Sequence, residues 1–163
     1  RSTLFPYTTL FRSTNRGKAD IKDGAEIAIP NDASNGARAL ILLDKNGLIK
    51  LKDNTNILSS VKDIVENPKN IKFTEVEAAQ LPRVINDVDG AVINGNYAIE
   101  AGLNPTKDAK FIEGKDSPYA NLLAVRTGEE NNETYKKVLK ALQSEKVKEF
   151  INKTYNGAVV PAF

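Results

Sequence analysis

The chain has 163 residues, of which 40% are hydrophobic and 27% are charged, with 23 Lys and Arg against 21 Asp and Glu. This composition is typical of a globular domain, and no run of about 18 apolar residues is present that could span a membrane. The chain contains no His and no Cys, which excludes disulfides, thiolate or imidazole metal ligands and a Ser-His-Asp triad.

The first thirteen residues differ in character from the rest. The string TLFPYTTLFRS at residues 3–13 resembles, codon for codon, the translation of a common sequencing-library adapter. We therefore interpret residues 1–13 as an assembly artefact and expect the natural gene to continue upstream, the alternative being a genuine aromatic arm. Removing Arg1 and Arg12 lowers the basic count from 23 to 21, equal to the acidic count, so charge indicates neither nucleic-acid nor membrane-surface binding.

The predicted elements begin after a polar linker at residues 14–24. The apolar run AEIAIP at residues 25–30 predicts a buried strand, and a helix follows through residues 37–43. Its N-cap oxygens come from Asn31, Asp32 or Ser34, and Asn46-Gly47 closes it.

The middle of the chain alternates between strand and helix patterns. Short helices are predicted at residues 61–66, 77–85 and 94–101, the last closed by Gly102. Strands are predicted at residues 71–76, 90–93, 109–112 and 122–125. Such alternation predicts an α/β domain with a largely parallel sheet, and sheets of this kind bind ligands at the carboxyl ends of their strands.

Two amphipathic helices are predicted near the C-terminus. Their apolar stripes follow helical spacing and consist of Tyr135, Val138, Leu139 and Leu142 in the first and Val147, Phe150 and Ile151 in the second. Ser144 is placed to cap the second helix.

Arg38 is the first candidate binding residue. It lies among Ala37, Ala39 and Leu40, where a buried guanidinium would need a partner. Its forked donors suit a carboxylate, and the nearby helix N-terminus also favours an anion. The alternative is an arginine on the exposed face of the helix.

Asn94, Tyr97 and Asn121 are further candidates, because they follow predicted strands or lie in a turn before one. An amide donates and accepts hydrogen bonds, which suits the backbone groups of an amino acid, whereas the alternatives are helix capping by Asn94 and an ordinary loop around Asn121. Glu75 and Glu77 are spaced as a possible acid/base pair, but no nucleophile or metal cluster accompanies them, so a solvated strand end is the better interpretation.

Five ordered strings carry a resemblance to a known family. They are AEIAIPNDASNGARALILLDKNGLIKL, DIVENPKNIKFTEVEAAQLPR, VDGAVINGNYAIEAGLNPTKDAKF, KDSPYANLLAVR and NGAVVPAF. The similarity runs from about residue 18 to residue 163, and this part of the chain resembles the NlpA family of methionine-binding lipoproteins.

The resemblance implies a periplasmic-binding-protein-like α/β fold of type II. Residues 14–24 would form a crossover, residues 25–126 a largely complete second lobe, and residues 127–163 helices that return toward a first lobe not covered by this chain. Family members also carry a lipid-modified cysteine, a histidine motif and aromatic cleft residues in that first lobe, none of which can be assigned here. The apolar stripe of Tyr135, Val138, Leu139 and Leu142 would then lack much of its natural packing partner.

The resemblance also implies a function. The chain would belong to the substrate-binding component of an ABC importer, which binds an amino acid, methionine first, and delivers it to a permease and ATPase complex. Arg38 would pair with the ligand carboxylate, Asn94 and Asn121 would contact its backbone groups, and Tyr97 would line the cleft. The protein would be lipid-anchored in the cell envelope, facing the periplasm or exterior, without catalysis, metal or cofactor. The alternatives are a non-transport surface lipoprotein or sensor domain, and an enzyme on a related α/β scaffold.

Overall fold

The computed structural model describes residues 2–3, 9–13, 21–114, 117–119, 121–155, 157–161 and 163. They divide into two compact units, one formed by Thr9–Glu113 and the other by residues 2–3 together with the described residues from Gly114 onward. The expected lobes at residues 25–126 and 127–163 stay a prediction about the longer protein.

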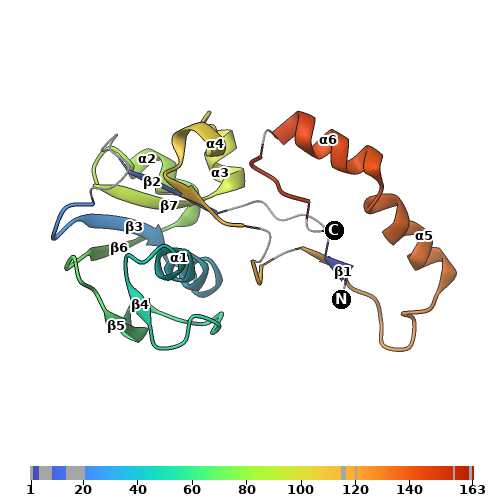
Figure 1. Cartoon of the computed structure of the whole chain (residues 1–163), viewed down its shortest axis with the longest axis horizontal. Coiled ribbons are helices and arrows are strands. Elements are labelled where there is room, and N and C mark those ends of the chain that lie inside the picture. Colours follow the sequence, from blue (N-terminus) through green and yellow to red (C-terminus); the bar gives the residue numbers. More distant parts are fainter. Residues whose placement is uncertain are drawn as a thin grey trace. The chain divides into compact units, whose positions relative to one another are not determined.

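The first unit is built on a five-stranded sheet with the order β6-β3-β7-β2-β8 (Figure 1). Its strands are β6 (Lys72–Val76), β3 (Glu26–Pro30), β7 (Gly90–Asn94), β2 (Thr9–Ser13) and β8 (Phe111–Ile112). Strand β3 runs parallel to β6 and β7, whereas β2 is antiparallel to both β7 and β8. The prediction of an α/β fold is therefore confirmed, and the sheet is mixed, with four strands in one direction and β2 in the opposite one.

Four α-helices accompany this sheet. They are α1 (Ala33–Lys45), α2 (Leu81–Val84), α3 (Gly95–Glu100) and α4 (Pro105–Asp108). The first begins at Asp32, whose side chain accepts a hydrogen bond from the Asn35 backbone N–H and caps the helix as predicted. Gly47 and Gly102 follow α1 and α3 with φ of 72° and 76°, which confirms both as helix stop signals.

Two predicted helices differ from the structure. Residues 61–66 form a 3₁₀ turn, η1 (Val61–Asp63), followed by strand β5 (Ile64–Glu66), which pairs with β4 (Lys50–Leu51). The β-branched pair Ile64-Val65 favours this strand over a further helical turn. Residues 77–85 divide into η2 (Ala78–Gln80) and α2, because Pro82 has no N–H to continue a helix through the junction.

The sheet is buried on both faces. On one face Ala28, Ala91 and Ile93 join a cluster with apolar residues of α2 and α3. Ile27, Ile29 and Val92 alternate with them along the strands and therefore face the other side, where α1 buries most of its apolar residues. Strands covered on both faces explain the near-continuous apolar runs of the sequence.

Strand β2 falls within the adapter-like string. Its residues Leu10 and Phe11 are fully buried, and the Phe11 ring stacks on Phe111 with ring centroids 4.6 Å apart. A Cβ at Gly90 would lie 2.8 Å from the Phe11 ring, so only glycine fits opposite it without movement. How this segment packs is thus described, whereas its origin as an artefact stays a prediction.

The second unit contains strand β9 (Leu122–Leu123), paired antiparallel with β1 (Ser2–Thr3), and helices α5 (Glu133–Leu142) and α6 (Glu145–Tyr155). Both predicted helices are confirmed. Helix α5 has no buried residue, and Val138 and Phe150 are 44% and 59% exposed. The predicted apolar stripes are thus partly uncovered. None of the described helices combines the length and apolar character that a membrane crossing requires.

Gly36 lets the first turn of α1 approach the end of β3. A Cβ at this position would lie 2.9 Å from the Pro30 carbonyl oxygen, a backbone atom that cannot swing aside. The close approach matters for function because the same turn carries Asn35 and leads to Arg38.

We therefore expect Gly36→Ala to destabilise the protein by about 1–3 kcal/mol, the usual cost of overpacking. The expected loss is opposite in sign to the usual effect of Gly→Ala in a helix interior, which raises the free energy of unfolding by roughly 1 kcal/mol. Urea unfolding followed by circular dichroism measures the difference, with Ser34→Ala, at an exposed position of the same turn, as the control. A Gly36→Ala protein more stable than the parent would contradict the close approach.

Candidate functional site

The polar residues gather where the parallel strands end. Strand β3 leads through Asp32 into α1, β7 leads through Asn94 into α3, and β8 is followed directly by Glu113. Strands β3 and β7 are parallel, and β8 has the same direction because β2 is antiparallel to both β7 and β8. The side chains therefore share the sheet edge at which α/β folds bind ligands.

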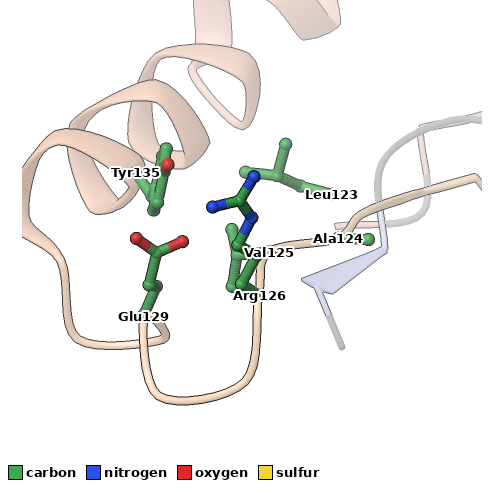
Figure 2. Close-up of a pocket in the computed structure, with 6 residues that line it drawn as sticks. All are labelled: Leu123, Ala124, Val125, Arg126, Glu129 and Tyr135. Carbon is green, nitrogen blue, oxygen red and sulfur yellow. The ribbon is translucent and has the colours of Figure 1, made fainter.

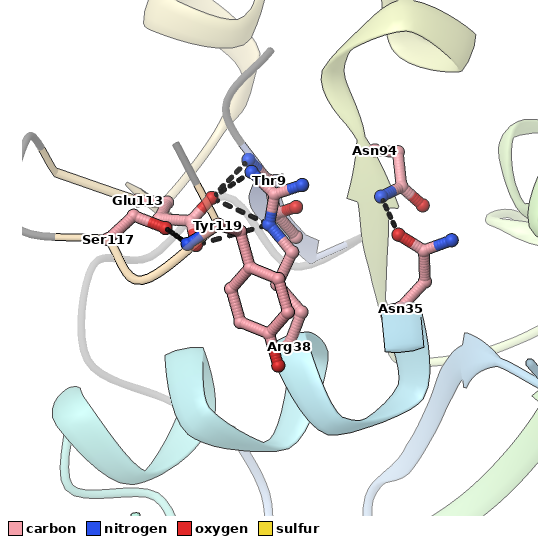
Figure 3. Close-up of polar contacts among 7 residues, drawn as sticks. All are labelled: Thr9, Asn35, Arg38, Asn94, Glu113, Ser117 and Tyr119. Atoms are coloured by element: carbon pink, nitrogen blue, oxygen red, sulfur yellow. Dashed lines mark hydrogen bonds and ion pairs between the residues drawn. The ribbon is translucent and has the colours of Figure 1, made fainter. Parts of the chain in front are cut away.

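Arg38 forms a buried ion pair with Glu113 (Figure 3). Only 12% of the Arg38 side chain and 9% of the Glu113 side chain are exposed. Nε of Arg38 donates to Oε1 and Oε2 at 3.1 and 2.9 Å, and Nη2 donates to Oε2 at 2.5 Å. Arg38 therefore does not lie on an exposed helix face, and its Nε–Nη2 edge is held by a carboxylate of the protein itself.

Glu113 is tied to β2 as well as to α1. Its Oε2 accepts a hydrogen bond from the Thr9 backbone N–H at 3.1 Å, and its own N–H donates to the Thr9 carbonyl at 2.8 Å. A buried carboxylate is tolerated when several donors replace its water shell, which Arg38 and Thr9 do here. Glu113 thus fixes the guanidinium against the sheet.

Asn94 belongs to a second polar group, also drawn in Figure 3. It occupies the N-cap position of α3 but its side chain makes no capping hydrogen bond. Instead its Nδ2 donates to Asn35 Oδ1 at 2.8 Å, and Asn35 Nδ2 donates to both carboxylate oxygens of Asp32, at 3.1 and 3.0 Å. Asn35 precedes Arg38 by one turn of α1, so the Arg38–Glu113 pair and the Asp32–Asn35–Asn94 group are both attached to this helix.

The other predicted site residues lie elsewhere. Tyr97 is half-buried on α3 and packs against the apolar cluster that contains Ala98. Asn121 is exposed and belongs to the second unit, and its neighbours Asp116 and Ala120 fall outside the described residues. Within the first unit, the structure therefore brings together Arg38 and Asn94 through α1.

The acidic residues considered for catalysis are exposed. Glu75 lies on β6 and Glu77 directly follows that strand, and both side chains face solvent. Among the described residues, no group of three or more acidic side chains is placed to hold a metal ion.

Three residues of the site were not singled out from sequence as site residues. Glu113 could have been found by the strand-end rule, because it directly follows β8, but a lone Glu in FIEGKD carries no sign of its partner. Asn35 and Thr9 act through hydrogen bonds to residues far along the chain, at separations of 59 and 104 positions, and no local pattern announces these contacts.

A hollow of about 530 Å³ lies within the second unit (Figure 2). Figure 2 shows the Arg126 guanidinium and the Glu129 carboxylate side by side, near the Tyr135 ring. The lining residues are Leu123, Ala124, Val125, Arg126, Glu129 and Tyr135. They come from the end of β9, the loop that follows it and the start of α5, and none of the predicted site residues is among them.

Comparison with known proteins places this geometry in a family context. The chain is 49% identical over 142 residues to the probable D-methionine-binding lipoprotein MetQ of Pasteurella multocida, covering 87% of this chain and 51% of that protein. It is 49% identical over 143 residues to the D-methionine-binding lipoprotein MetQ of Escherichia coli, covering 86% and 53%. The chain spans about half the length of these curated relatives.

A solved structure is similar as well. It is a nutrient binding protein from Burkholderia cenocepacia bound to methionine, with a TM-score of 0.82 and 48% identity, covering 99% of this chain and 68% of that one. The family model described as NlpA lipoprotein matches residues 6–163. The chain belongs to the NlpA lipoprotein family.

Proposed function

We propose that this chain forms the second lobe, with its return helices, of the substrate-binding component of an ABC importer that binds methionine. The observation that carries the proposal is the buried Arg38 guanidinium, held by Glu113 at the ligand-binding edge of an α/β sheet. Membership in the NlpA family and similarity to a protein bound to methionine support it.

The chemistry of Arg38 fits the carboxylate of an amino acid. A guanidinium has two edges that can each hold a carboxylate with two parallel hydrogen bonds. Glu113 holds the guanidinium through its Nε–Nη2 edge, and a ligand carboxylate would pair with the same fixed guanidinium. Asn94 would bind a backbone group of the same ligand, and Asn121 and Tyr97 stay further proposed ligand contacts.

Binding without catalysis is the function these residues support best. The candidate acid/base residues Glu75 and Glu77 are exposed, and the relatives named above are described as binding proteins. The relatives are also lipoproteins. We therefore propose that the whole protein is lipid-anchored in the cell envelope and delivers its ligand to a permease and ATPase complex.

Replacing Arg38 by Lys tests the ligand contact. The substitution keeps the positive charge beside Glu113 but loses the planar fork, so methionine binding by the full-length protein should weaken at least tenfold. Titration calorimetry measures this, and Arg83→Lys, at an exposed position of α2, is the matched control that should bind like the parent. Unchanged affinity in Arg38→Lys would remove Arg38 from the site.

Replacing Glu113 by Gln tests the internal ion pair. Because the change leaves a buried guanidinium without its counter-charge, we expect a loss of about 3–5 kcal/mol in the free energy of unfolding. The control is Glu66→Gln in the exposed pair with Lys50, which should cost less than about 1 kcal/mol. Adding Arg38→Gln to Glu113→Gln should restore part of the stability, and equal losses for Glu113→Gln and Glu66→Gln would show that the pair is not the buried anchor.

A further inference from the structure

We infer that Asp32 and Asn35 are positioning residues that fix the Asn94 amide with its oxygen as the group offered to the ligand. The Asn94 oxygen then accepts a hydrogen bond from a donor, the ammonium of an amino acid, because an acceptor oxygen does not bind a carboxylate. This inference rests on the proposed function and deepens it, because it names the ligand group that Asn94 selects and two residues that act through it.

The first step is the orientation of Asn35. An ionised carboxylate is only an acceptor, so the side-chain group of Asn35 that faces Asp32 must be its NH₂ group. The distances agree, since Nδ2 of Asn35 lies 3.1 and 3.0 Å from the two carboxylate oxygens of Asp32. Asp32 is itself held at the N-cap of α1 by the Asn35 backbone N–H at 3.0 Å.

The second step passes this orientation to Asn94. With its nitrogen committed to Asp32, Asn35 turns its Oδ1 toward Asn94, and an oxygen can only accept from the Asn94 nitrogen. The Nδ2–Oδ1 distance of 2.8 Å is that of a good hydrogen bond. The assignment of oxygen and nitrogen in both amides therefore follows from the charge of Asp32, which settles an ambiguity that amide shape alone leaves open.

The third step concerns the remaining oxygen of Asn94. The residue is only 7% exposed, and its Oδ1 is buried without a hydrogen-bond partner among the described residues. A buried acceptor without a donor is unfavourable, so its retention at a binding edge points to a ligand that supplies the donor. Arg38 lies on α1 and carries hydrogen-bond donors, and Asn94, bonded to Asn35 of the same helix, carries an acceptor. A donor and an acceptor together complement the carboxylate and the ammonium of a zwitterion.

The Asn35→Ala substitution tests this polarity. It removes the acceptor for Asn94 Nδ2, at a half-buried helix position where Ala is well tolerated. In the full-length protein, binding of L-methionine should weaken about tenfold, the size of one hydrogen bond to a charged group, whereas binding of 4-(methylthio)butanoate, which lacks the amino group, should stay unchanged.

Ser34→Ala, one position earlier on the exposed side, is the control and should leave both ligands unaffected. Equal weakening of both ligands in Asn35→Ala, or no weakening of either, would overturn the assigned polarity.

A second measurement separates this inference from the proposed function. In the full-length protein without ligand, the Asn94 side-chain NH₂ protons should exchange slowly by NMR and become fast in Asn35→Ala. If the full-length parent binds no amino acid at millimolar concentration, the proposed function fails. The NMR result still shows whether Asp32 and Asn35 fix the Asn94 amide. Identical Asn94 amide signals in the parent and in Asn35→Ala would refute the positioning role.

Discussion

The buried ion pair between Arg38 and Glu113 is the constraint on which the site depends. Removing two charges from water is costly, and the cost is offset only when the geometry is good and further donors complete the carboxylate. Here the two side chains meet along one full edge of the guanidinium, and the Thr9 N–H adds a third donor. The pair joins α1 to the ends of two strands, so the guanidinium is positioned before any ligand arrives.

This arrangement also decides what kind of ligand the edge of the sheet suits. Because Glu113 already balances the charge of Arg38, the pair is neutral as a whole, and a ligand of net charge zero disturbs it least. The Asp32–Asn35–Asn94 relay adds a fixed acceptor beside the fixed donors. A zwitterionic amino acid meets both requirements, whereas a simple anion or cation meets only one.

Much of the fold could be predicted from local sequence patterns. The strand at Glu26–Pro30, the Asp32 cap and the two C-terminal helices follow from apolar runs, capping residues and helical spacing, which act over a few positions. The turn and strand at residues 61–66 were predicted as a helix, because the β-branched Ile64 and Val65 are too short a local signal without the pairing of β5 with β4. Whether a segment forms a helix or a strand could thus be predicted where residues close to it in the sequence determine its structure.

The candidate site could be predicted only in part, for the same physical reason. Arg38 and Asn94 were predicted as ligand-binding residues from their residue types and from their positions after predicted strands. The resemblance to the family supported both predictions. Glu113, which determines how Arg38 is held, lies 75 residues away and is linked to it only by the sheet order. Long-range partners of this kind are invisible to periodicity, and Asn121, in the other compact unit, stays a proposed contact.

The most direct test of the account is a crystal structure of the full-length protein with methionine bound. We predict that the methionine carboxylate lies within hydrogen-bond distance of the Arg38 guanidinium, with Glu113 still on its Nε–Nη2 edge, and that the ammonium donates to Asn94 Oδ1. A methionine bound elsewhere, or one whose carboxylate has displaced Glu113 from Arg38, would contradict it.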